Sequence, residues 1–392
     1  MNYPRIFLTV DNCFAIKRWV KPLDWMRVIK EFGVDYIEAS TDNECDPLFN
    51  PLEYLEDWAE EVKTAQERTH AKVVNFYTGY QTYRTVGLAH HDKRVREKLF
   101  QEWLQPMVRM AAKLDAGLGF FLHAFPVEVL QVPEVYKHVQ NTVIQILSEL
   151  AVYAWEQGPV EVSVEQMYAP HQPPWTISGA KEYLKEIYSK TKKPFYITID
   201  LGHQVGQRKF MRLSYDKIKK MLKKYRLGET IENLWLGSDS TYKLFTDAAN
   251  LPEAQEDEAI REIEQEMNRY PYLFAEYDDG DPYKWLEELG CYSPIMHLQQ
   301  NNGMSSYHAH FIEENNRTGI IRGDNVLKAI AKSYERGGEP GMPPKCEAIY
   351  LSFEIFAGNT EMNHDVMNRF KESVSYWRKF IPKDGLKLNE LI

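Results

Sequence analysis

The feature that most limits the fold of this chain is a regular alternation of short apolar runs with longer amphipathic segments. The short runs are rich in β-branched and aromatic residues, and in the longer segments apolar residues recur at three- and four-residue spacing, as they do in helices. Eight runs occur, at residues 5–10, 36–40, 72–78, 118–125, 160–167, 195–200, 294–299 and 348–356. This alternation predicts a parallel sheet covered by helices.

Eight strand and helix units can close into a barrel or lie in an open, doubly wound sheet. An open sheet usually binds a nucleotide through a glycine-rich loop, and neither GxGxxG nor GxxxxGK with a following Ser or Thr comes after any of the runs. We therefore expect an α/β protein with the (β/α)8 TIM barrel fold, closed by a last helix at 365–381.

The connection at 204–281, between the sixth and seventh expected strands, is much longer than the others and contains helical patterns at 214–228 and 258–270. We expect one barrel domain over 1–392 with this segment as an insertion. Two roles stay open for the insertion. It could form a lid over the active site, because loops at that end of a barrel carry function, or it could be a peripheral decoration or a contact between subunits.

Charge and cysteine usage argue against several classes of protein. The formal net charge of −10 argues against a generic binder of the nucleic-acid backbone, whose affinity comes from clustered Lys and Arg. The four cysteines are scattered without a CxxC pair, which suggests neither a disulfide framework nor a zinc knuckle. No run of about 18 apolar residues occurs, and the first residues do not resemble a signal peptide. We expect a cytoplasmic protein that binds neither nucleic acid nor a membrane.

Polar side chains stand at or near the ends of four expected strands, where an apolar core would not place them. They are Glu165, Asp200, His297 and Glu354. The carboxyl ends of barrel strands converge at the face where active sites lie. One such carboxylate alone is usually a helix cap or an ion-pair partner. Three carboxylates close together repel one another unless a cation neutralises them, and this oxygen-rich set suits Mn²⁺, Mg²⁺ or Co²⁺ better than a structural zinc.

Four stretches carry a resemblance to a known group of proteins: "VEQMYAPHQPPWTISGAKEYL", "ITIDLGH", "IMHLQQNNG" and "LSFEIF". In this order and spacing they resemble the sugar isomerase and epimerase group of xylose isomerase-like TIM barrels, in particular the ketose 3-epimerases. The resemblance implies that Glu165, Asp200, His297 and Glu354 bind one divalent metal ion, with Mn²⁺ expected first and Mg²⁺, Co²⁺ or Zn²⁺ as alternatives. It also implies that His203 contacts the substrate, and that subunits pair into a homodimer or homotetramer.

The resemblance further implies a reaction on a small sugar or sugar phosphate. A metal ion that bridges a carbonyl and the adjacent hydroxyl stabilises the enediolate formed when a neighbouring proton leaves. In this group two glutamates on opposite sides of the carbon exchange that proton, and Glu165 and Glu354 match them as acid and base. Return of the proton to the same carbon gives epimerisation, and return to the neighbouring carbon gives aldose–ketose isomerisation. The sequence leaves both outcomes open.

The epimerases carry an arginine six residues after the ligand histidine, whereas this chain has Gly303 there. Gln299 or Asn301 could replace it by bonding sugar hydroxyls, and His308 or His310 could enter from the same loop, although each is equally compatible with plain loop structure. Arg322, near a helix start, could hold a sugar phosphate.

Two further residues, on the second and fourth expected strands, are candidates for binding substrate. They are Glu38 and His123. Glu38 could instead pair with a cation of the barrel, and His123 could be a core histidine bonded to backbone.

Two other functions compete with the isomerase or epimerase. One is an endonuclease-IV-like phosphodiesterase, which shares this barrel and requires several zinc ions in a histidine-rich site. The negative net charge and the few strand-end histidines argue against it. The other is a non-catalytic sugar-binding barrel, against which the intact pair Glu165 and Glu354 argues.

Overall fold

The expected barrel is confirmed by the computed structural model, which describes residues 2–79, 85–121, 123–336 and 338–392. Eight parallel strands pair in chain order, and β8 and β2 both pair with β1, so that the sheet closes on itself. The strands are β1 Arg5–Asp11, β2 Tyr36–Ser40, β3 Lys72–Thr78, β4 Gly117–Phe120, β5 Val162–Glu165, β6 Tyr196–Asp200, β7 Ile295–Leu298 and β8 Ala348–Phe353.

The eight strands match the expected runs, with differences at their ends. The run expected at 118–125 is a strand only to Phe120, and its residue Leu122 lies outside the described residues. β8 ends at Phe353, so Glu354 follows the strand directly rather than lying inside it. A short strand that the sequence pattern did not predict, β9 (Leu386–Lys387), pairs antiparallel with β1 and brings the two chain termini side by side.

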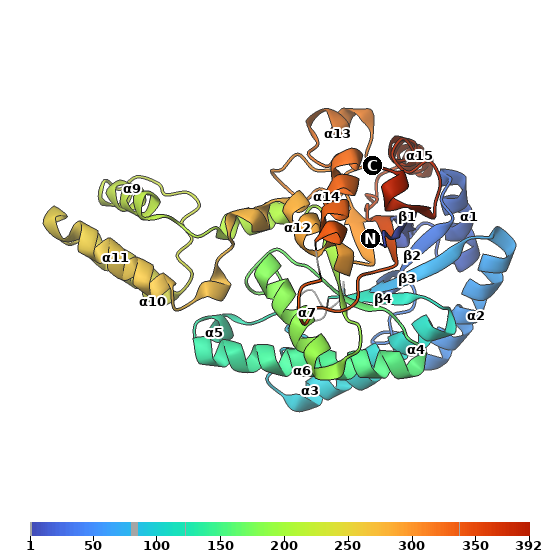
Figure 1. The fold of residues 1–392 in the computed structure, drawn as a ribbon, viewed down its shortest axis with the longest axis horizontal. Helices are drawn as coiled ribbons and strands as arrows, with labels where there is room; N and C mark the ends of the chain where they lie inside the picture. The colour runs from blue at the N-terminus through green and yellow to red at the C-terminus, as the bar shows by residue number, and fades with distance from the viewer. Residues whose placement is uncertain (1, 80–84, 122, 337) are drawn as a thin grey trace.

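Helices surround the barrel (Figure 1). They are α1 Pro22–Phe32, α2 Leu52–Thr69, α3 Lys93–Leu99, α4 Gln105–Lys113, α5 Val127–Leu130, α6 Pro133–Gln157, α7 Ile177–Thr191, α8 Gln204–Gln207, α9 Tyr215–Arg226, α10 Asp239–Ala248, α11 Glu256–Met267, α12 Pro282–Leu289, α13 Glu313–Thr318, α14 Gly323–Glu335 and α15 Asn363–Trp377. Local sequence sets several of their ends. The hydroxyl of Thr176 accepts a hydrogen bond from the amide of Gly179 at the start of α7, and α1 ends at Gly33 in the left-handed conformation.

The inside of the barrel is apolar at one end and polar at the other. Successive side chains of a strand point to opposite faces, so Leu8 and Val10 of β1 pack under the helices while Phe7, Thr9 and Asp11 point inward. Phe7 stacks on Tyr350 with ring centroids 4.8 Å apart and closes the amino-terminal end of the barrel. Towards the carboxyl ends of the strands the inward side chains become hydroxyls, amides and carboxylates, and these surround the candidate site.

The segment between β6 and β7 contains α8 to α12, and Figure 1 shows α9, α10 and α11 extending to the left, away from the barrel strands. Its base is anchored where Tyr272 stacks on Tyr136 of α6 at 3.7 Å and donates a hydrogen bond to the carbonyl of Leu130. The insertion, its role as a lid or a subunit contact, and the single domain over 1–392 stay predictions. Within the described ranges, no helix combines the length and apolar character needed to cross a bilayer.

Candidate metal centre

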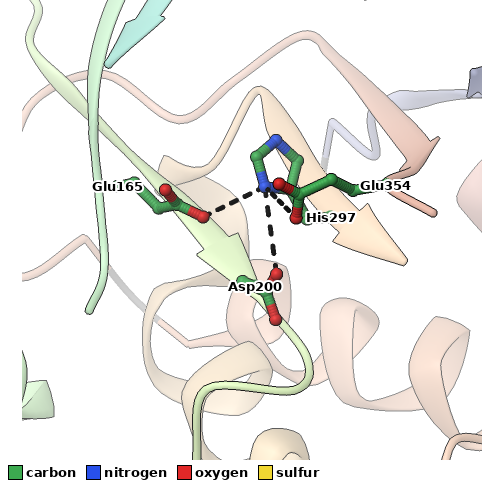
Figure 2. A group of neighbouring side chains, drawn as sticks. All are labelled: Glu165, Asp200, His297 and Glu354. Carbon is green, nitrogen blue, oxygen red and sulfur yellow. Dashed lines mark hydrogen bonds and ion pairs between the residues drawn. The ribbon is translucent and has the colours of Figure 1, made fainter. Parts of the chain in front are cut away.

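Four side chains that were singled out in the sequence meet at the carboxyl ends of neighbouring strands (Figure 2). Glu165 ends β5, Asp200 ends β6, His297 lies in β7, and Glu354 follows β8. Asp200 and His297 are register partners across the β6–β7 pair, which places them at the same height in the barrel. All four are buried. The parallel register therefore joins residues that lie up to 189 positions apart in the chain.

Distances between the polar atoms fit a single cation. Nδ1 of His297 lies 3.1 Å from Oε1 of Glu165, 3.1 Å from Oε2 of Glu354 and 4.0 Å from Oδ2 of Asp200. One ligand atom from each of the four residues lies within 4.8 Å of all the others. Around an ion with bonds of about 2.1 Å, ligands at right angles lie about 3.0 Å apart and opposite ligands about 4.2 Å apart. The donor set thus has the spacing and the oxygen-rich chemistry of a divalent-metal site.

The electrostatics of the centre are dominated by buried negative charge. Burial by itself lowers the pKa of His297, but the charges of Glu354 and Glu38 and hydrogen bonds to Glu165 and Glu354 raise it well above its usual value. Burial raises the pKa of Glu354, although the imidazoles of His297 and His308 oppose this. Without a metal ion, the protonated imidazole of His297 therefore supplies the positive charge that the carboxylates require.

Tyr77, at the inward face of β3, supports the centre in a way that sequence reasoning missed. Its hydroxyl donates a hydrogen bond to Oε2 of Glu165, and its ring packs edge-on against His297 with centroids 5.4 Å apart. The signal available in the sequence was the alternation along β3, which turns Asn75 and Tyr77 to the same face of the strand, towards the inside of the barrel.

The side chain of Gln299 lies beside Asp200 and is held by hydrogen bonds. Its amide nitrogen donates to Oδ1 and Oδ2 of Asp200 at 2.9 and 3.0 Å, and its oxygen accepts from the hydroxyl of Ser306 and the amide of His308, both at 2.9 Å. These contacts use the usual hydrogen-bonding capacity of a primary amide. The expected contact of Gln299 with substrate stays a prediction, and the structure shows it holding Asp200 in place.

Gly202 makes room for this amide. A Cβ atom added at Gly202 would lie 2.3 to 2.5 Å from the amide atoms of Gln299. We expect Gly202→Ala to push Gln299 away from Asp200, to lower the free energy of unfolding by about 1–3 kcal/mol through overpacking, and to weaken metal binding. Urea denaturation and metal titration measure the two effects. Gly358→Ala is the control, because the nearest atom to its added Cβ would lie 3.6 Å away. Equal stability of the two variants would contradict the packing argument.

His203 follows β6 and lies at the edge of the centre. Its Nδ1 donates to the carbonyl of Gln166 at 2.7 Å, which leaves Nε2, 3.9 Å from Oδ2 of Asp200, without the ring proton in the neutral form. His203 also lines a cavity of about 280 Å³ together with Tyr168, Lys209 and Ser306. This position beside both Asp200 and a cavity is compatible with the expected substrate contact, which stays a prediction.

The other two candidates for substrate binding lie deeper. Nε2 of His123 contacts the carbonyl of Pro173, and burial lowers the pKa of His123 to about 4, so this ring is neutral. Its contacts match the alternative of a core histidine bonded to backbone. Oε2 of Glu38 lies 3.2 Å from Nε2 of His297, on the side of the ring opposite the candidate metal ligands.

The loop after β7 contains Gly303, at the position where the ketose 3-epimerases carry an arginine. The guanidinium of Arg208 donates to the carbonyl of Gly303 at 3.0 Å, so a cation from the β6–β7 segment stands beside this position. His308 donates through Nδ1 to the carbonyl of Glu354 at 3.1 Å and joins the centre, whereas His310 packs against Phe370.

Two further residues named from the sequence, Asn301 and Arg322, lie outside the centre. Asn301 bonds backbone groups of its own loop and of Leu201. Arg322 is exposed at the start of α14.

Comparisons with known proteins agree with the fold. Residues 26–226, just over half of the chain, match the profile of a family described as xylose isomerase-like TIM barrel. A curated relative, D-erythrulose 1-phosphate 3-epimerase of Brucella abortus, is 31% identical over 107 residues. That match covers 27% of this chain and 31% of the relative, so it spans less than a third of the relative's length.

Solved structures share the fold over nearly the whole chain. A candidate xylose isomerase of Rhodospirillum rubrum superposes with a TM-score of 0.67 and 16% identity, covering 95% of this chain and 99% of that one. The IolI protein, solved with a bound zinc atom, superposes with a TM-score of 0.53 and 14% identity, covering 95% and 98%. At these identities the likeness establishes the fold.

Proposed function

Because this chain belongs to the xylose isomerase-like TIM barrel family, we propose that it is a metal-dependent isomerase or epimerase of a small sugar or sugar phosphate. The observation that carries the proposal is the approach of two glutamates from different strands, Glu165 and Glu354, to the same nitrogen of His297 at 3.1 Å each (Figure 2). The relative that epimerises a ketose phosphate supports the substrate class.

A divalent cation held by Glu165, Asp200, His297 and Glu354 would polarise a sugar carbonyl and stabilise the negative charge of an enediolate. The oxygen-rich ligand set suits Mn²⁺, Mg²⁺ or Co²⁺. The resemblance to the ketose 3-epimerases makes Mn²⁺ the first ion to test, with Zn²⁺ as a further alternative. The zinc of the IolI structure supports a metal ion in a barrel of this shape.

The chain's own groups would move the proton. Glu165 and Glu354 act as base and acid on the carbon beside the carbonyl, each taking the proton in one direction and returning it in the other. The hydroxyl of Tyr77 holds Oε2 of Glu165, which restricts how this carboxylate turns. Nε2 of His203, beside the cavity, forms a hydrogen bond with a sugar hydroxyl. All four residues are buried, which limits the access of bulk water to their charged groups.

No observation favours the phosphodiesterase. Among the described residues, a second group that could hold a metal ion consists of Asp11, Glu38 and His297, and it shares its histidine with the first group. Within the described ranges, neither of these two groups contains a histidine other than His297, whereas the phosphodiesterase requires a histidine-rich site for several zinc ions.

Deuterium incorporation from solvent tests the proposal. The protein with Mn²⁺ is incubated in D₂O with a panel of ketoses and ketose 1-phosphates, and mass spectrometry follows the sugars. Metal-dependent exchange into one sugar is expected, and that sugar identifies the substrate class. Exchange that persists when a chelator removes the metal ion would contradict the role of the metal. No exchange across the panel would contradict the enediolate chemistry.

A further inference from the structure

The imidazole of His297 lies between two sets of carboxylates. Its Nδ1 faces Glu165, Asp200 and Glu354, and its Nε2 lies 3.2 Å from Oε2 of Glu38. Both His297 and Glu38 are fully buried. Among the described residues, neither Nε2 of His297 nor Oε2 of Glu38 has a hydrogen-bond partner. At 3.2 Å each is the available group for the other, so Glu38 is placed to accept the Nε2 proton.

Glu38 is itself held in one orientation. The amide nitrogen of Asn75 donates to Oε1 of Glu38 at 2.8 Å and to the carbonyl of Phe76 at 3.0 Å. The Phe76 carbonyl fixes which end of the Asn75 amide points towards Glu38, because a flipped amide would set two oxygens against each other. Gly119 of β4 leaves room for this amide, since a Cβ there would lie 3.2 Å from its nitrogen.

The proton on the ring decides whether His297 can bind a metal ion. A neutral imidazole carries one proton, and only the tautomer with the proton on Nε2 presents a lone pair at Nδ1. A carboxylate that accepts a hydrogen bond from the far nitrogen selects that tautomer and also fixes the plane of the ring.

We propose that Glu38, held by Asn75, is a positioning residue that accepts the Nε2 proton of His297 and so directs Nδ1 towards Glu165, Asp200 and Glu354. This inference rests on the proposed function in requiring a metal ion at that centre. It assigns Glu38 to the metal site rather than to the substrate. A second metal ion between Asp11, Glu38 and His297 is the competing arrangement, and it would require both ring nitrogens to bind metal without a proton.

Glu38→Gln tests the proposal with almost no change in size. With the Asn75 nitrogen donating to the oxygen of the new amide, the substituted side chain presents its NH₂ group to Nε2 and favours the tautomer with the proton on Nδ1. We expect 10- to 100-fold weaker metal binding, measured by competition of Zn²⁺ and Mn²⁺ between the protein and a chromophoric chelator. In the zinc-loaded wild type, ¹⁵N chemical shifts of the histidines should show His297 protonated at Nε2, and the variant should lose this signature.

Glu44→Gln is the matched control. Glu44 is a second carboxyl group near β2 that accepts hydrogen bonds on both oxygens, from Trp58 at 2.6 Å and Asn12 at 3.3 Å. Burial raises its pKa to about 8, and it is not one of the carboxylates that face the ring nitrogens of His297. The same chemical change there should leave metal affinity unchanged. If Glu38→Gln does not fold, Asn75→Ala keeps the carboxylate but frees it, and a several-fold loss of affinity is expected.

Three results would overturn the inference. The first is that wild type and Glu38→Gln have the same metal affinity and the same ¹⁵N shifts. The second is that the wild-type chain binds two metal ions and the variant loses one of them. The third is that the wild type binds no metal ion. The last result would also remove the metal from the proposed function. Metal binding that depends on Glu38, combined with no exchange into any sugar, would keep the inference and reject the proposed reaction.

Discussion

Replacing either Glu165 or Glu354 by Gln is expected to lower sugar interconversion by about 10²- to 10⁴-fold, the usual contribution of a positioned acid or base. Glutamine keeps the size of the side chain and one oxygen but cannot take up the proton. The measurement is the rate of product formation with the sugar that exchanges deuterium. Metal content is determined for each variant, because both residues are also candidate ligands.

The two variants also distinguish epimerisation from isomerisation. In an epimerase with a base on each side, the remaining glutamate still exchanges the proton of the one epimer whose C–H bond faces it, although interconversion is lost. The control is Glu161→Gln, which precedes β5 at the opposite end of the same strand. Wild-type rates in both metal-loaded active-site variants would rule out the acid and base roles.

Replacing His297 by Ala is expected to destabilise the metal-free protein by about 3–5 kcal/mol, because it leaves buried carboxylates without their cation. Glu38 on one side, and Glu165 and Glu354 on the other, lie 3.1 to 3.2 Å from the ring nitrogens. Urea denaturation in the presence of a chelator measures the loss. His310→Ala is the control, because His310 is also buried but burial lowers its pKa to about 4, so no charge is removed.

The same histidine predicts how stability depends on pH. The pKa of His297 in the folded protein is raised above the unfolded value of about 6.5. Its contribution is therefore present in full below about pH 6.5 and is lost as the pH rises through the folded value. The free energy of unfolding of chelator-treated wild type should fall as the pH increases above 6.5, and His310→Ala should show the same fall. A flat profile would contradict a protonated His297.

The order of the elements and the candidate ligands could be read from the sequence because both depend on local pattern. The alternation of residues in "FYITIDLGHQ" identifies a buried strand, and Asp200 at its end signals chemistry without any partner being known. The same reasoning found Glu165, His297 and Glu354. A closed barrel then required only that eight such units occur in order.

Only the tertiary structure shows which side chains lie beside these candidate ligands. Tyr77 meets Glu165 across 88 positions of the chain, Asn75 meets Glu38 across 37, and Gln299 meets Asp200 across 99. Such pairs depend on the register between strands around the barrel and on the shift between Ile37 and Glu38 where β2 pairs with β3. A one-residue change of register turns every side chain of a strand to the other face. The sequence by itself therefore determined which groups are candidates for the chemistry, whereas the closed sheet decided which groups lie beside them and hold them.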